Sequence, residues 1–176
     1  MSLHMADDAS ATPRSQPDRQ RALRTALGQF ATGVCIVSCA DDTAHPTPFA
    51  ITVNSIASVS LEPALVLWCI QKQSTTYELW MRAKQFGISV LNEQQSDLCN
   101  RFALRGNHAM GAAGDYEFST AGNPLIVGAV ATFDCDTDAH HDAGDHTIIV
   151  ARVRNFTSDE SQQPLIYARG AVYEST

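Results

Sequence analysis

The sequence predicts a mainly β fold of antiparallel strands with a few flanking helices, and three observations support this prediction. Residues 52–61 alternate apolar and small polar side chains, as a half-buried strand does. Residues 64–70 form an apolar run of strand length, which indicates a strand covered on both faces. The few helical patterns do not alternate with the strands, which argues against a doubly wound parallel sheet. Pattern alone leaves a β-sandwich and a β-barrel both open.

The composition indicates a single globular domain. The chain has 176 residues, of which 44% are hydrophobic and 18% charged, so one sizeable core is expected. The net charge of −7 argues against a nucleic-acid partner, which requires clustered Lys and Arg. No apolar run is long enough to span a membrane, and five scattered cysteines without a Cys-x-x-Cys pair suit the cytoplasm. We expect a disordered arm over residues 1–20 and one domain over residues 21–176.

The first helix is expected over residues 17–32. Leu23, Leu27 and Phe30 recur at helical spacing, and Gly33 is expected as a left-handed residue after the helix. We then expect strands over the following ranges: 34–39, 50–61, 64–71, 86–91, 129–137, 146–156 and 164–172.

Two further helices are expected between these strands. One begins near Ser74, where Thr75 and Glu78 have the spacing of a capping box. The other begins at Asn92 with Gln95 three residues later. Residues 108–122 are rich in Gly and Ala and are expected to form a loop.

The polar face of the strand over residues 52–61 is the first candidate for chemistry. It carries hydroxyl and amide groups without charge, which suit the polar edge of a planar ligand or, alternatively, an ordinary exposed strand. Ser74, Thr75 and Thr76 are the second candidate, because unpaired N–H groups at a helix start favour an anion. The alternative is that Thr75 is only a helix cap.

The segment from His140 to His146 contains three His and two Asp in seven residues, which raises the question of a metal site. His140 and His141 are adjacent on an extended chain, so their side chains point to opposite faces and we expect no metal. Residues 142–144 are better interpreted as a tight turn, with His146 opening the next strand. No nucleophile elbow and no dinucleotide-binding glycine fingerprint are present in the sequence.

Four motifs in order resemble the flavin reductase family with an FMN-binding split barrel, which supplies reduced flavin to two-component monooxygenases. They are F-A-T-G-V at residues 30–34, T-x-N-S-x-x-S-V-S-L at residues 52–61, S-x-T at residues 74–76, and G-D-H at residues 144–146. The resemblance runs from about Arg21 to Tyr173. It implies a six-stranded antiparallel split barrel that forms a homodimer.

The resemblance also implies the site. Contacts to the flavin ring and ribityl chain are expected from these residues: Thr52, Val53, Asn54, Ser55, Ser58, Val59 and Ser60. Ser74 and Thr76 would hold the flavin phosphate, and Arg101 would add a charge-assisted bond. His146 would contact the nicotinamide nucleotide, with His140 and His141 exposed to solvent.

We therefore expect a reductase that uses NADH or NADPH to reduce FMN, or FAD, for a partner oxygenase. Two alternatives stay open on the sequence: a flavin-binding carrier or sensor without turnover, and a flavin-dependent oxidase on the same fold. A carrier has no need of a nicotinamide contact, so His146 bears on this choice.

Overall fold

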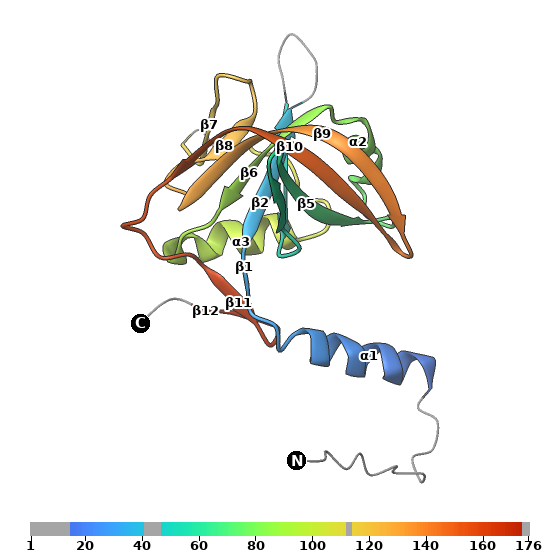
Figure 1. The fold of residues 1–176 in the computed structure, drawn as a ribbon. Coiled ribbons are helices and arrows are strands. Elements are labelled where there is room, and N and C mark those ends of the chain that lie inside the picture. The colour runs from blue at the N-terminus through green and yellow to red at the C-terminus, as the bar shows by residue number, and fades with distance from the viewer. Residues whose placement is uncertain (1–14, 41–46, 112–113, 174–176) are drawn as a thin grey trace, which may run out of the picture.

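The structure is a computed structural model that describes residues 15–40, 47–111 and 114–173, and it is mainly β (Figure 1). Its main sheet has seven antiparallel strands in the order β3-β2-β6-β9-β10-β5-β4. These are β2 (Cys35–Ala40), β3 (Pro48–Val53), β4 (Ala57–Leu61), β5 (Ala64–Gln71), β6 (Gln85–Val90), β9 (Ala131–Ala143) and β10 (His146–Ser158).

Two small sheets flank the main one. β1 (Thr32–Gly33) pairs with β11 (Ile166–Ala168), which pairs with β12 (Ala171–Tyr173). β7 (Tyr116–Phe118) lies inside residues 108–122, which were expected to form a loop, and pairs with β8 (Pro124–Ile126) just after them.

The main sheet curls so that its two outer strands approach each other. β3 and β4 lie at opposite edges of the sheet, yet only residues 54–56 connect them. Four steps of extended chain span at most about 14 Å, so the two edges meet at this connection. No hydrogen-bonded ladder between β3 and β4 closes the sheet within the described residues.

The expected single strand over residues 50–61 is wrong, because the chain breaks at residues 54–56 and forms two strands. Ser55 explains the break: its Oγ accepts from the backbone N of Cys69 at 3.0 Å and lies 3.4 Å from the backbone O of Cys69. These contacts take the place of a backbone ladder there. The main sheet consequently has seven strands instead of the expected six.

The core inside the curled sheet is built around two tryptophans. Trp68 of β5 lies edge-to-face against Trp80, with ring centroids 5.2 Å apart, and against Phe86 of β6 at 5.9 Å. Trp80 comes from α2 (Tyr77–Arg82), so this short helix packs onto one end of the core. A second apolar cluster, including Phe102 of α3 (Ser96–Ala103), packs between α3 and strands β2 and β3.

The first helix, α1 (Gln16–Leu27), ends earlier than expected and buries none of its side chains. Gly28 caps it in a right-handed conformation, and Gly33 instead pairs with Ile166 in β1, so the expected left-handed cap at Gly33 is wrong. The backbone N of Arg169 donates to the backbone O of Gly28 at 2.7 Å and ties the end of α1 to the β11–β12 hairpin. Residues 1–14 of the expected disordered arm lie outside the described residues. The rest of the arm is not disordered as expected, because α1 begins at Gln16.

The other two expected helix starts have different outcomes. The expected capping box of Thr75 and Glu78 is wrong, because α2 begins after Thr76, which makes no side-chain cap bond. The expected start at Asn92 is confirmed, with a capping box between Asn92 and Gln95 at the short 3₁₀ turn Glu93–Gln95 that precedes α3. No helix among the described residues is both long and apolar enough to cross a membrane.

Candidate functional site

A cleft of about 380 Å³ lies between β3 and the end of β5, beside residues 54–56, which connect the two outer strands. One wall consists of the end of β3, the end of α3 and the loop after α3. The other wall consists of the end of β5, the segment before α2 and the first residue of β10. Residues 54 and 55 lie between the two walls.

Six of the residues expected at the site line this cleft: Thr52, Val53, Asn54, Ser55, Ser74 and His146. They come from three separate parts of the chain: residues 52–55, residue 74 and residue 146. Thr75, for which the sequence left open a role as a helix cap only, also lines the cleft.

Thr52 and Ser55 have structural partners as well as a place in the cleft. Thr52 Oγ1 donates to the backbone O of Cys99 at 2.8 Å, which fixes α3 against β3. Ser55 Oγ bonds to the backbone of Cys69, as described above, and fixes the connection against β5. These hydroxyls therefore set the shape of the cleft, whether or not they also contact a ligand.

Ser58, Val59 and Ser60 lie on β4 and do not line the cleft. The pairing of β4 with β5 shifts register between Ser58 and Ser60, as at a β-bulge. Ser58 and Val59 are exposed on this edge strand. Residues 58–60 are thus separated from Asn54 by the bend at residues 54–56, which the alternating pattern did not reveal.

Thr76 and Arg101 also lie outside the cleft lining and have partners elsewhere. Thr76 Oγ1 accepts from the indole Nε1 of Trp80 at 3.1 Å and lies 3.0 Å from Ser74 Oγ. Arg101 forms an ion pair with Asp115, with Nη1 and Oδ2 2.8 Å apart. Of the three residues expected to hold the phosphate, only Ser74 lines the cleft.

His146 is positioned by the hairpin turn between β9 and β10. Gly144 has a φ of 69°, which a glycine adopts without strain, and His146 opens β10 as expected. Lys72 clamps the turn: its Nζ lies 2.6 Å from Asp142 Oδ2 and 2.7 Å from the backbone O of Gly144. This contact lowers the pKa of Asp142 through a hydrogen bond and the Lys72 charge.

The imidazole of His146 is oriented by its neighbour Asp145. Nδ1 of His146 lies 2.7 Å from Asp145 Oδ1, and this hydrogen bond, with the charge of His146, lowers the pKa of Asp145. With the proton on Nδ1 donated to Asp145, Nε2 is the ring nitrogen available to a ligand.

Sequence reasoning missed several residues of the cleft. Phe102, Ala103, Arg105 and His108 come from the end of α3 and the loop that follows it. The only local signal was a loop with two basic side chains, and nothing in the pattern placed it beside β3. Two hydrogen bonds do so: Ala50 N donates to His108 O at 2.8 Å, and Met110 N donates to Pro48 O at 2.9 Å.

No group of three His, Cys, Asp or Glu side chains in the described part of the chain could hold a metal ion. His140 and His141 are both exposed, as expected. The five cysteines form no disulfide with one another in this part of the chain. Burial raises the pKa of Cys69, the thiol that lines the cleft, so it is a poor nucleophile.

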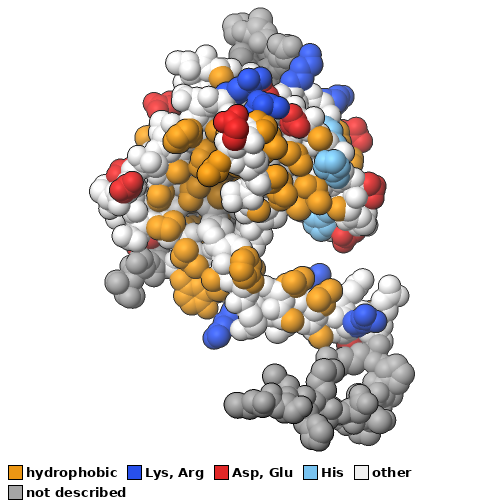
Figure 2. Space-filling view, viewed as in Figure 1, with side chains coloured by type: hydrophobic (Ala, Val, Ile, Leu, Met, Phe, Trp, Pro, Cys, Tyr) orange, Lys and Arg blue, Asp and Glu red, His pale blue; other side chains and the backbone are white. Residues whose placement is uncertain are grey.

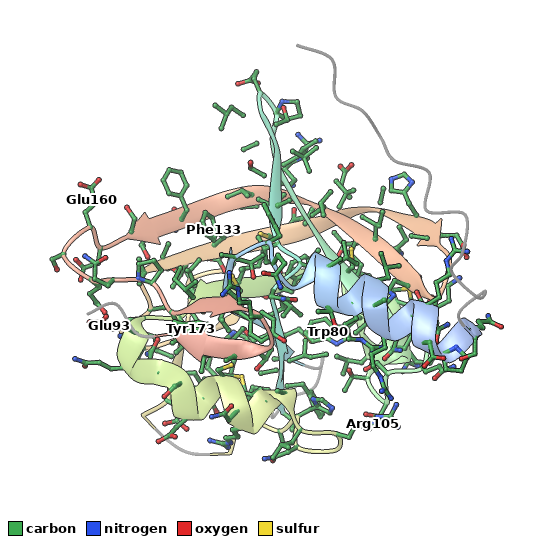
Figure 3. The ribbon with its side chains drawn as sticks, turned by 90° about the horizontal axis from the view of Figure 1, so that it is seen from below. Trp80, Glu93, Arg105, Phe133, Glu160 and Tyr173 are labelled. Carbon is green, nitrogen blue, oxygen red and sulfur yellow. The ribbon has the colours of Figure 1, made fainter. Side chains whose placement is uncertain are left out.

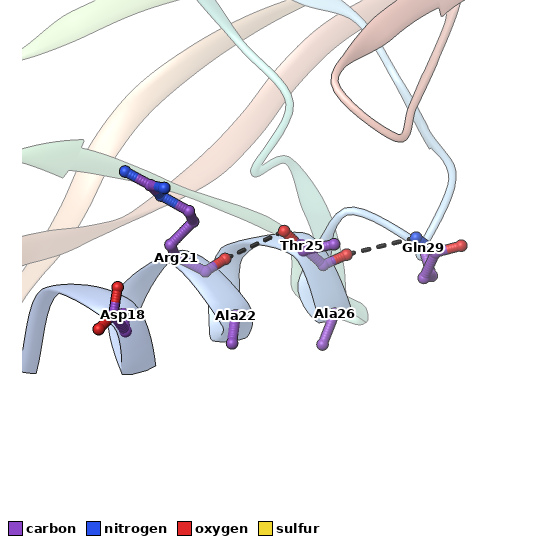
Figure 4. A pocket seen from close by; sticks show the side chains of 6 residues that line it. All are labelled: Asp18, Arg21, Ala22, Thr25, Ala26 and Gln29. Carbon is purple, nitrogen blue, oxygen red and sulfur yellow. Dashed lines mark hydrogen bonds between the residues drawn. The ribbon is translucent and has the colours of Figure 1, made fainter. Parts of the chain in front are cut away.

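A larger hollow, of about 680 Å³, lies along one face of α1 and is lined by Asp18, Arg21, Ala22, Thr25, Ala26 and Gln29 (Figure 4). All of these residues come from α1 and the turn after it. This hollow is an open helix face, and the cleft between β3 and β5 is the better candidate because several elements converge there.

Comparison with known proteins identifies the fold. The chain matches the flavin reductase like domain over residues 27–176. It is 44% identical over 158 residues to the reductase component of the flavin-dependent trigonelline monooxygenase of Acinetobacter baylyi, covering 87% of this chain and 48% of that protein. It is 41% identical over 154 residues to the FMN reductase (NADH) SmoA of Agrobacterium fabrum, covering 88% and 85%. The chain thus spans about half of the first relative and most of the second.

The solved structure of the NADH:FAD oxidoreductase SgcE6 of Streptomyces globisporus, in complex with NAD and FAD fragments, has the same fold. Its TM-score is 0.82 at 29% identity, covering 94% of this chain and 98% of that one. The family match spans most of the sequence and the fold agrees with a solved reductase along nearly its whole length. The chain therefore belongs to the flavin reductase family.

Proposed function

We propose that this chain is an NAD(P)H-dependent flavin reductase that transfers a hydride from nicotinamide to FMN or FAD. The observation that carries the proposal is the cleft, whose lining in the described chain contains hydroxyl, amide and basic groups but no carboxylate. Relatives at 41–44% identity are named as flavin or monooxygenase reductases.

The residues of the cleft fit a flavin. Its ring needs apolar surface beside neutral hydrogen-bonding groups, and it must not face a carboxylate that would repel its electron-rich edge. Ile51, Val53 and Ile70 supply apolar surface. Asn54, between the two walls, supplies an exposed amide, and Ser74 supplies a hydroxyl from the segment before α2.

A bound flavin supplies the electron-accepting ring. The protein binds and orients the two nucleotides and excludes water. The reaction consumes NAD(P)H, oxidised flavin and a proton and yields NAD(P)⁺ and reduced flavin. In our proposal His146 orients the nicotinamide nucleotide through Nε2, with its ring held by Asp145. Thr52 and Ser55 keep the two walls of the cleft in place.

Anaerobic mixing of the protein with NADH and excess FMN tests this function. We expect the flavin absorption band to bleach over many turnovers. Binding without bleaching would instead identify a carrier or sensor. Turnover of a second substrate in the presence of O₂ but without NADH would identify an oxidase.

The reduced flavin is proposed to pass to a partner monooxygenase, as the names of the relatives imply for those proteins. Since the chain spans only 48% of the Acinetobacter relative, we base this on the reductase subunit HsaB of a flavin-dependent monooxygenase of Rhodococcus jostii, which is 36% identical and is covered over 84% of its length. Adding an oxygenase component to the reductase, NADH and FMN should couple NADH oxidation to substrate hydroxylation.

We also propose that the curled sheet is the family's split barrel, with the split between β3 and β4. The three-residue connection between the two outer strands supports this, because it brings both edges of the sheet together.

A homodimer is proposed from two apolar surfaces that a single protomer leaves uncovered. On β5 and β10, Trp68 and Ile149 face the core, whereas the cross-strand pair Leu67 and Val150 lies on the outer face and is only half-buried. On α1 and the turn after it, Leu23, Leu27 and Phe30 are 58%, 66% and 77% exposed. Figure 2 shows hydrophobic side chains on both surfaces, with an open space between α1 and the body.

A second copy is the occupant we propose for these surfaces. An isolated helix of 12 residues is marginal in water, so α1 needs packing that its own protomer does not supply. Its described charges are three arginines and one Asp, against −7 for the whole chain, which favours contact with an acidic body. Light scattering should give twice 19.0 kDa at micromolar concentration. A mass of a single chain would contradict the dimer.

A further inference from the structure

The cleft is locally basic in an acidic protein. The chain has a net charge of −7 and 19 Asp and Glu residues, yet none of these acids lines the cleft in the described chain. Arg105, His108 and His146 do line it. A cleft walled by one sign of charge concentrates ligands of the opposite sign, so this one favours anions.

Arg105 is the permanent charge among these three groups, and its guanidinium has no partner among the residues that the structure describes. From residue 47 onward, every other arginine in the described chain forms a hydrogen bond or ion pair: Arg82, Arg101, Arg152, Arg154 and Arg169. Arg105 has no such contact within the described residues and is exposed at the rim, close to the lower edge of Figure 3. Its five N–H donors are therefore available to a ligand.

The backbone around Arg105 is held in place on both sides. Before it, α3 is fixed to β3 by the bond from Thr52 to Cys99. After it, Ala50 N donates to His108 O at 2.8 Å, and an isolated β-bridge pairs Phe49 with Ala109. Asn107 N also donates to Leu104 O at 3.3 Å, which closes a turn around Arg105. A short, doubly anchored loop thus presents this side chain at the rim of the cleft.

We infer that Arg105 binds a phosphate group of the nucleotides that enter the cleft and is a determinant of substrate specificity. This inference rests on the proposed reductase function. A planar guanidinium binds phosphate through two parallel N–H···O bonds, which a hydroxyl such as that of Ser74 on the opposite wall cannot do. The phosphate belongs either to the flavin nucleotide or to the nicotinamide nucleotide. These share one chemistry, and substrates that lack the phosphate separate them.

The test compares parent, Arg105→Gln and Arg105→Lys in two substrate series. The flavin series is riboflavin against FMN at saturating NADH. The nicotinamide series is dihydronicotinamide riboside against NADH at saturating riboflavin. We expect Arg105→Gln to lower kcat/KM by roughly 10- to 100-fold for the phosphorylated member of one series only, with Arg105→Lys recovering part of the loss. The series that responds identifies which nucleotide Arg105 binds.

Arg82→Gln is the matched control, because Arg82 is also exposed but bonds to Glu78 O on α2, away from the cleft. In both series it should leave unchanged the ratio of kcat/KM for the phosphorylated substrate to kcat/KM for the unphosphorylated one. If Arg105→Gln changes neither ratio, or lowers phosphorylated and unphosphorylated substrates equally, the inference is overturned. Fluorescence titration of FMN and riboflavin without NADH keeps the test independent of turnover. A parent that binds FMN but never oxidises NADH refutes the proposed reductase while leaving Arg105 testable by binding.

Discussion

His146 lines the cleft at the start of β10, with its Nδ1 bonded to Asp145. We predict that His146→Ala lowers kcat/KM for NADH by about 10- to 100-fold, the equivalent of roughly 1.4–2.7 kcal/mol of transition-state binding. FMN affinity should change little. Stopped-flow reduction under anaerobic conditions measures both.

His141→Ala is the control for that experiment, since His141 is exposed on β9 opposite Ile148 and lies outside the cleft lining. It should behave like the parent. Equal kinetic losses in the two variants would remove His146 from the site.

Ser74 and Thr76 are predicted to differ, although the sequence suggests the same role for both. Ser74→Ala should weaken FMN binding and leave riboflavin binding unchanged, because Ser74 lines the cleft and is the residue expected to contact the phosphate that riboflavin lacks. Thr76→Val should instead cost about 1–3 kcal/mol of folding free energy, because it leaves the buried indole N–H of Trp80 without its acceptor. Urea unfolding and flavin titration on each variant separate the two effects. A Thr76→Val protein as stable as the parent would contradict the structural role.

At the scale of elements, β6 depends on the absence of a side chain at Gly87. A Cβ there would lie 2.5 Å from Leu125 Cδ2 and 2.9 Å from the backbone O of Pro124, on neighbouring β8. That oxygen also accepts a hydrogen bond from the buried Ser38, so the strand cannot easily withdraw. We predict that Gly87→Ala destabilises the fold by about 1–3 kcal/mol.

Gly33→Ala serves as the comparison for Gly87→Ala, because nothing lies within 4 Å of a Cβ at Gly33 in β1. Thermal unfolding followed by circular dichroism should show a clear loss for Gly87→Ala only. Similar transition temperatures in the two variants would mean that β8 adjusts without cost.

At the scale of the whole molecule, buried thiols make stability depend on alkaline pH. Burial raises the pKa of Cys35 from 9.0 to about 12, and burial with the charges of Asp134 and Asp136 does the same for Cys135. The folded protein keeps both protons while the unfolded chain loses them above pH 9. The stabilisation is therefore complete below pH 9 and is lost progressively as pH rises toward 12.

We predict a decline of up to about 1.4 kcal/mol per pH unit for each of these two thiols. Urea unfolding at a fixed protein concentration between pH 8 and 11 measures it. The variant Cys35→Ala with Cys135→Ala should be less stable at pH 8 but should lose stability less steeply above pH 9. Parallel slopes for parent and variant would contradict the prediction.

Much of the local structure was predictable because it depends on residues close in sequence. The Asn92–Gln95 capping box, the turn before His146 and the doubly apolar strand over residues 64–70 all follow from short patterns. The mainly β fold was likewise predictable from the order of such patterns, and the family from four motifs. Six of the residues expected at the site also line the cleft, because they flank chain turns where strands end.

Long-range packing settles what those patterns leave open. The break in the strand over residues 50–61 arises because Ser55 bonds to Cys69, 14 residues away. Thr76 accepts a hydrogen bond from Trp80, and Arg101 forms an ion pair with Asp115. Arg105, in the loop after α3, stays available at the rim of the cleft. Alternation and helix caps depend on near neighbours, whereas a cleft depends on which distant hydroxyls and charges the folded chain brings together. The partners of each side chain therefore emerge only when the sheet curls and its two edges meet.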